Sequence, residues 1–154
     1  MNNRFFTNLK EEIKLKRIKA NIYNIIDWLF DDEKFDNKYW NKKKLAKFTK
    51  MIKKKYMNDK NYQYGPIKSL KFPKSKKNLY IVISKGNSEI KDITRHIRNG
   101  IAHNHTTIKN ISSNVYFEIK DFSYNRQTSQ MLITYDFLND LYIIYNEIKV
   151  NKSI

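Results

Sequence analysis

The stretch SEIKDITRHIRNGIAHNHTT, residues 88–107, combines a helical apolar pattern with a dense group of basic and imidazole side chains. Isoleucine recurs at positions 90, 93, 97 and 101, which is the spacing of one face of an α-helix. We predict a helix that begins at Asn87 or Ser88, because either side chain can cap its first turn. This helix carries all three histidines of the chain, so it is the natural centre of any site.

Outward from this helix, the chain reads as mostly helical. Amphipathic spacing predicts helices over about 7–30, with Thr7 as N-cap, over about 40–57, and over about 135–149 after Thr134. Residues 58–77 read as a loop, and 114–122 with 130–134 read as a β-hairpin. The run NLYIVISKG, residues 78–86, fits a strand or a short buried helix. We favour a helix there because no alternating partner strand lies nearby in sequence.

These elements predict a mostly α fold, an antiparallel helical bundle with one inserted β-hairpin. The 154 residues suit a single domain spanning 1–154. The chain has no cysteine, which excludes disulfides, cysteine-based zinc sites and thiol catalysis. No apolar run approaches the roughly 18 residues that span a bilayer, and no secretory signal is visible. A cytoplasmic protein without membrane contact is expected.

The net charge of +16 favours a polyanionic partner, above all nucleic acid. Part of this charge also fits the Lys, Asn and Ile usage of an A+T-rich genome. Residues 1–77 hold 22 Lys and Arg against 8 Asp and Glu, so the basic surface belongs to the first half of the chain. On the helix over 40–57 we expect an electrostatic track for RNA, and the alternative is a plainly solvated face. Its candidate residues are Lys43, Lys47, Lys50 and Lys54.

Three chemical interpretations of the histidine cluster compete. A metal site is disfavoured, because His103 and His105 are too close in sequence for one helix face and cysteine is absent. A structural role is open, since His96 and His103 are seven residues apart and nearly aligned on a helix. The third is metal-independent RNA cleavage, in which the ribose 2′-OH attacks its own phosphate. That reaction needs a group that titrates near neutral pH and a cation on the phosphate oxygens.

The spacing of Arg98 and His103 places them about 140° apart on an ideal helix, so they do not share a face. Either the helix loosens near Gly100, or His103 lies just beyond the helix end. A two-fold dimer could also bring two such pairs into one cleft.

The segment RNGIAH, Arg98 to His103, resembles the R-x4-6-H motif of the HEPN superfamily, in which a polar residue, here Asn99, often follows the arginine. HEPN domains are α-helical bundles of about this length. The order of elements resembles a subfamily with a short hairpin after the motif helix. The likeness covers about residues 5–149 and is strongest over 88–148.

This resemblance implies a metal-independent endoribonuclease without a cofactor, acting as the toxin of a toxin–antitoxin pair or as an abortive-infection or antiviral defence factor. Arg98 would contact the scissile phosphate, His103 would be the general acid/base, and Asn99 would orient one of them or the RNA. A homodimer with a composite active site is implied, with RNA such as tRNA as substrate.

Three residues of the cluster lie outside the motif and are auxiliary RNA-binding candidates: Arg95, His96 and His105. A neutralising partner is expected, either an acidic antitoxin or a modifying nucleotidyltransferase. The alternative function is a catalytically silent module that binds RNA or a protein partner.

Overall fold

The computed structural model describes residues 3–74 and 78–150 and shows a mixed five-stranded sheet with helices. The helices are α1 (Arg4–Lys14), α2 (Ile22–Leu29), α3 (Lys42–Tyr56), α4 (Glu89–Ala102) and α5 (Tyr135–Val150), with a 3-10 turn at Ile67–Ser69. The strands are β1 (Tyr62–Gly65), β2 (Tyr80–Ser84), β3 (Thr106–Ile111), β4 (Asn114–Ser123) and β5 (Arg126–Thr134). The predicted mostly α bundle with one hairpin is therefore wrong, and the fold is α+β.

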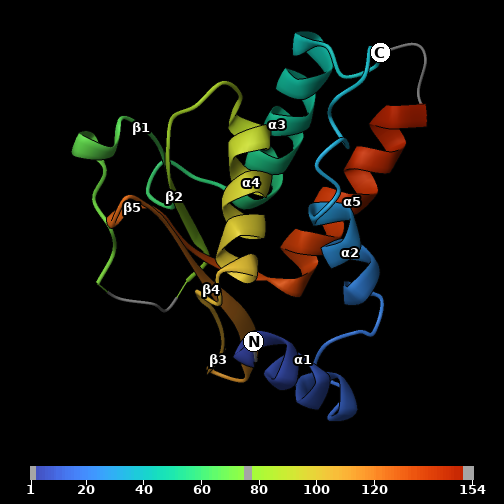
Figure 1. The fold of residues 1–154 in the computed structure, drawn as a ribbon, viewed down its shortest axis with the longest axis vertical. Helices are drawn as coiled ribbons and strands as arrows, with labels where there is room; N and C mark the ends of the chain where they lie inside the picture. The colour runs from blue at the N-terminus through green and yellow to red at the C-terminus, as the bar shows by residue number, and fades with distance from the viewer. Residues whose placement is uncertain (1–2, 75–77, 151–154) are drawn as a thin grey trace.

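The sheet has the order β1-β2-β5-β4-β3, with β1 and β2 parallel and all other pairs antiparallel. Figure 1 shows the sheet on one side of the molecule and helices α2, α3 and α5 on the other, with α4 between them. Helix α4 contacts β4 and β2 on one side and α3 and α2 on the other. Arg95, His96, Arg98 and Asn99 are thus positioned by a helix held from two sides.

The main core lies between the sheet and the helices. The apolar stripe of α4 is fully buried in it, as the spacing of its isoleucines predicts. The sheet contributes Ile81, Ile83, Phe117, Ile119, Met131 and Ile133. The opposite face of the sheet buries a smaller apolar cluster built on Tyr80, Val82 and Leu132, against which Leu70 and Phe72 pack.

Strand β2 corrects the helix predicted over 78–85. Ile81 and Ile83 face the helices, and Tyr80 and Val82 face the smaller cluster, so both sides of the strand are buried. A strand buried on both faces is a continuous apolar run without alternation, which the sequence alone does not distinguish from a buried helix. Its partners, β1 and β5, lie far away along the chain or in the segment read as a loop.

The single helix predicted over 7–30 is two helices, α1 and α2. The chain turns at Lys16, whose φ of 60° is left-handed and cannot continue an α-helix. Arg17 folds back onto Glu12, with its Nε 2.6 Å from a carboxylate oxygen. The first cap is Asn3 rather than Thr7, since the Asn3 side chain accepts a hydrogen bond from the backbone of Phe5.

Two hairpins form the antiparallel end of the sheet. The turns between β3 and β4 and between β4 and β5 each place two residues at positive φ, namely Ser112 with Ser113 and Tyr124 with Asn125. Consecutive left-handed residues are the geometry of tight hairpin turns, which usually contain glycine or Asn-Gly. Ser112-Ser113 lacks that signature, so the sequence does not indicate the hairpin that contains β3.

The helices predicted over 40–57 and 135–149 are confirmed as α3 and α5.

Gly100 lets α4 approach β4 closely, and Gly100→Ala is expected to reduce the free energy of unfolding by about 1–3 kcal/mol. A Cβ at this position would collide with a methyl carbon of Ile119 and would lie 2.9 Å from the backbone oxygen of Lys120. Alanine favours a helix over glycine by about 1 kcal/mol, but the clash includes backbone and outweighs that gain. Urea unfolding of both proteins measures the difference. Equal stability would show that β4 moves aside at no cost.

Candidate functional site

Helix α4 distributes the residues of the opening stretch to three different surroundings. The helix continues without loosening at Gly100 and ends at Ala102, and His103 lies at its C-terminal boundary. The five-residue spacing of Arg98 and His103 is therefore explained by the position of His103 just beyond the end of the helix. Arg98 and Asn99 are half-buried, His96 is buried, and His103 is exposed.

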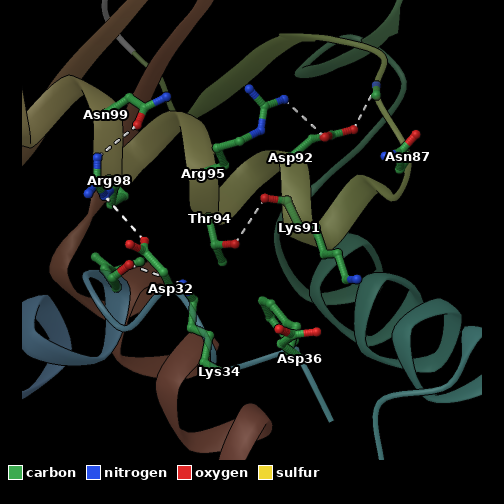
Figure 2. Close-up of a pocket in the computed structure, with 13 residues that line it drawn as sticks. Asp32, Lys34, Asp36, Asn87, Lys91, Asp92, Thr94, Arg95, Arg98 and Asn99 are labelled. Carbon is green, nitrogen blue, oxygen red and sulfur yellow. Dashed lines mark hydrogen bonds and ion pairs between the residues drawn. The ribbon is translucent and has the colours of Figure 1, made fainter. Parts of the chain in front are cut away.

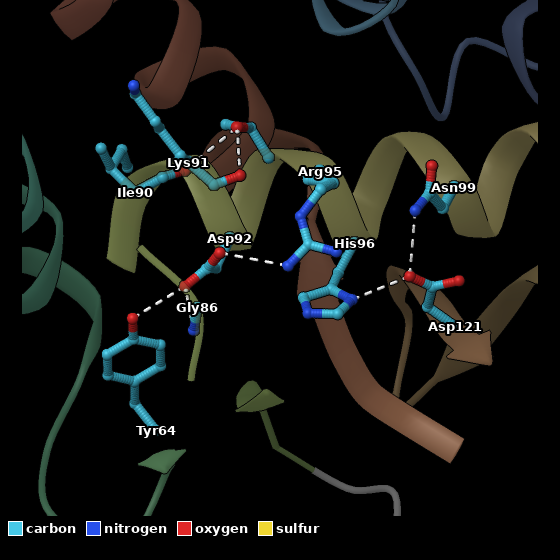
Figure 3. A network of polar contacts seen from close by, with 10 residues as sticks. Tyr64, Gly86, Ile90, Lys91, Asp92, Arg95, His96, Asn99 and Asp121 are labelled. Atoms are coloured by element: carbon cyan, nitrogen blue, oxygen red, sulfur yellow. Dashed lines mark hydrogen bonds and ion pairs between the residues drawn. The ribbon is translucent and has the colours of Figure 1, made fainter. Parts of the chain in front are cut away.

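His96 belongs to a buried polar network with Asp121 and Asn99 (Figure 3). Its ring is 1% exposed, and Nδ1 lies 2.8 Å from a carboxylate oxygen of Asp121 on β4. Asn99 donates its side-chain N–H to the same oxygen at 3.2 Å. Because the ring is closed to solvent, His96 acts here by holding the Asp121 carboxylate against α4.

Asp121 is the residue of this network that the sequence reading missed. Burial alone would raise the pKa of its carboxyl, but the hydrogen bonds from His96 and Asn99 outweigh burial and hold the pKa below its ordinary value. A signal was available, because alternation along β4 places Asp121 on the same face as Phe117 and Ile119. An aspartate on the inward face of a strand needs a partner, and the histidine of α4 supplies it.

Arg98 extends this network to the surface. Its guanidinium lies over the ring of Phe30, 5.1 Å from the ring centre, and donates to the side-chain oxygen of Asn99 at 3.3 Å. Its Nε is 3.8 Å from a carboxylate oxygen of Asp32, whose side chain is 77% exposed. Arg98, Asn99, Asp121 and His96 are thus joined by direct contacts from solvent to core.

The Arg98 guanidinium opens into a pocket of about 660 Å3 between α4 and the segment that follows α2 (Figure 2). One wall is α4, which presents Lys91, Arg95 and Arg98 together with Asn99. The facing wall presents Asp32, Lys34 and Asp36. The Lys34 ammonium is already occupied, because it donates to the backbone oxygens of Leu29 and Asp31. Burial lowers the pKa of Lys34, and the neighbouring aspartates only partly oppose this.

Asp92 fixes one end of this pocket. Its carboxylate accepts hydrogen bonds from the Tyr64 hydroxyl at 2.7 Å and from the backbone of Gly86 at 2.8 Å. Arg95 completes the arrangement, with Nη2 3.1 Å from the other carboxylate oxygen. Burial and this carboxylate raise the pKa of Tyr64 to about 12. Asp92 therefore orients Arg95 along the pocket wall.

His103 and His105 lie away from this pocket, at the end of α4. Both are exposed, and the His105 ring packs edge-on against Phe122 with ring centres 4.9 Å apart. In the part of the chain that the structure describes, no hydrogen bond, ion pair or ring contact joins Arg98 to His103. One chain therefore does not assemble the expected pair.

The Lys-rich side of α3 is a surface ridge, which we define as Lys43, Lys47, Lys50 and Lys54. These positions fall within about 60° of one another around an ideal helix, and all four are exposed. None of them is paired with a carboxylate among residues 3–74 and 78–150. The neighbouring Lys53 and Lys55, in contrast, pair with Glu89 and Asp140.

A groove of about 840 Å3 separates this ridge from α4. Lys50 and Lys54 of the ridge line it, and Lys91 lines it from α4. Asn87 and Lys91 line both this groove and the Arg98 pocket, so the two depressions are neighbours. The ridge therefore adjoins the pocket through the groove, with Lys91 as the cation that the two depressions share.

Two kinds of site are not seen within the described ranges. No three His, Cys, Asp or Glu side chains gather there in a way that could hold a metal ion. None of the described helices is both long and apolar enough to cross a membrane.

Comparison with known protein families, with curated proteins and with solved structures finds no match to this chain. The HEPN resemblance is therefore unsupported by any family match, and the fold contradicts it. HEPN domains are helical bundles, whereas α4 here packs on a five-stranded sheet that includes β1 and β2. The six-residue motif is too short to define a fold, and its identification as HEPN was wrong.

Proposed function

We propose that the protein binds RNA through the lysine ridge of α3 and the groove between α3 and α4. One observation carries this proposal, namely that four exposed lysines share one helix face without a carboxylate partner in the described chain. A nucleic acid carries condensed cations along its phosphates, and lysines that bind those phosphates release the cations, which favours binding. The net charge of +16 supports the same class of partner.

Cleavage of the bound RNA stays a prediction for Arg98, Asn99 and His103. Among the described residues Arg98 donates one hydrogen bond, which leaves donors for a phosphate, and His103 is exposed; both features favour this chemistry. Since one chain keeps the two side chains apart, a composite site would need a homodimer. An antitoxin or nucleotidyltransferase partner and a role in defence also stay predictions. Both depend on the protein cleaving RNA.

The test is a titration of a fluorescent single-stranded RNA with the purified protein in EDTA, at several salt concentrations. We expect binding whose affinity falls steeply as salt rises. Absence of binding at about 50 mM salt would contradict the proposal. The same samples, run on a denaturing gel beside His103→Ala and Arg98→Ala, test cleavage. Cleavage products that form with the wild type and with neither variant would show that the protein also cleaves RNA through these residues.

A further inference from the structure

The guanidinium of Arg98 has more hydrogen-bond donors than acceptors around it. Arginine carries five N–H donors, and within residues 3–74 and 78–150 Arg98 donates one hydrogen bond, the 3.3 Å contact to Asn99. Its Nε is buried and has no hydrogen-bond acceptor among the described residues, since the Asp32 oxygen lies 3.8 Å away. Because Nε is closed to solvent, an incoming acceptor such as a phosphate oxygen can reach only the terminal N–H groups of this side chain, which is 32% exposed.

Two further cations share the wall that carries Arg98. Arg95 is one helical turn away and is held in place by Asp92 through one of its nitrogens. Its side chain is 52% exposed and lines the pocket. Lys91 lies one further turn along the helix and is also exposed. Figure 2 shows Arg98 and Lys91 on the side of α4 that faces Asp32 and Asp36, whereas the Arg95 guanidinium is turned toward Asp92.

The facing wall carries two exposed carboxylates beside the buried Lys34, whose ammonium is bonded to backbone oxygens. The exposed carboxylates of Asp32 and Asp36 stand across the pocket from α4. Carboxylates accept hydrogen bonds from hydroxyl and amino groups and repel a second phosphate. The pocket therefore suits a ligand that is dianionic at one end and rich in hydroxyl or amino donors at the other.

We propose that this pocket binds a terminal nucleotide bearing a phosphate monoester, with the phosphate on Arg98 and the ribose or base edge toward Asp32 and Asp36. A monoester near neutral pH carries nearly two negative charges, against one for an internal phosphodiester, and matches three clustered cations better. The proposal rests on RNA binding at the ridge, because the strand would enter from the adjoining groove past Asn87 and Lys91.

The experiment compares RNA 8-mers of one sequence with a 5′-phosphate, a 3′-phosphate or only hydroxyl ends. Affinities are measured by fluorescence anisotropy for the wild type, Arg98→Gln and Lys14→Gln. Both variants lose one positive charge, but Lys14 is an exposed residue of α1, outside the ridge and outside the pocket. We expect at least one phosphorylated end to bind about tenfold more tightly to the wild type and to Lys14→Gln, and this preference to vanish in Arg98→Gln.

Loss of packing over Phe30 could unfold Arg98→Gln. The experiment therefore also includes two further variants, Arg98→Lys and Lys91→Gln. Arg98→Lys keeps the charge and should still lose most of the preference, because an ammonium does not present a guanidinium fork. A thermal-shift titration with free nucleoside monophosphates tests the same pocket without a strand. Stabilisation by the nucleotide without strand binding would support the pocket and contradict the ridge. Equal affinity for all three strands, with no nucleotide stabilisation, would overturn this inference while leaving RNA binding intact.

Discussion

Asp121→Ala is expected to lower the free energy of unfolding by about 3 kcal/mol, among the largest single-residue effects in this molecule. The carboxylate accepts hydrogen bonds from His96 and Asn99, and also from the backbone N–H of Phe122 at 2.9 Å. Alanine would leave these donors unpaired beside a 1% exposed imidazole. Unpaired buried donors keep the cost of lost hydration with nothing to offset it. Urea unfolding followed by circular dichroism measures the change.

Asp59→Ala is the matched control, because Asp59 is an exposed aspartate. We expect this control to stay within about 0.5 kcal/mol of the wild type. Asp121→Asn keeps the shape and one acceptor oxygen, so it should fall between the two. If Asp121→Ala were as stable as Asp59→Ala, the network around His96 would contribute nothing to folding.

The same carboxylate gives stability a specific pH dependence. Its pKa is lower in the folded protein than its ordinary value, so the folded state favours the ionised form. The stabilisation is fully present above the unfolded pKa of about 3.9 and is lost as the pH falls through the folded pKa. The stability difference between wild type and Asp121→Asn should therefore be constant above about pH 5 and shrink below about pH 4. A difference that stays constant down to about pH 2 would contradict this assignment.

The helices were predictable where one face is apolar and the other polar. Helices α3 and α4 show that pattern within their own sequences, and each boundary lies close to its predicted place. Strand β2 could not be identified in the same way, because its partners β1 and β5 cover it on both edges and both of its faces are buried. Such burial arises from contacts distant in sequence, which local periodicity does not record.

Part of the candidate site was likewise predictable from the sequence, and part was not. That the cluster lies on one helix followed from the sequence, and the angle between Arg98 and His103 correctly separated them. The pairing of His96 with Asp121 depends on the register of β4 beneath α4, and the Arg98 pocket depends on where the segment around Asp32 lies. Neither arrangement is encoded in local spacing. The six-residue motif carries no information about contacts distant in sequence, so the HEPN fold inferred from it was wrong.

Replacing the lysine ridge is expected to have a large effect on RNA affinity. Changing Lys43, Lys47, Lys50 and Lys54 together to glutamine is expected to weaken RNA binding about 100-fold near 100 mM salt. Because each lysine at a phosphate releases about 0.7 of a counterion from a single strand, the slope of log affinity against log salt should fall by about three. The four side chains are exposed, so the variant should unfold at nearly the wild-type urea concentration. Fluorescence anisotropy over a salt series measures both quantities.

The control removes the same charge from another surface. Lys10, Lys14, Lys16 and Lys19 are exposed residues in and after α1, which lies beside β3 and away from α3 (Figure 1). Changing these four to glutamine lowers the net charge equally, so any effect of total charge alone appears in both variants. A ridge that contacts phosphates requires the first variant to lose far more affinity and salt dependence than the second. Equal losses would mean that RNA is held by the overall charge of the protein and that α3 is merely solvated.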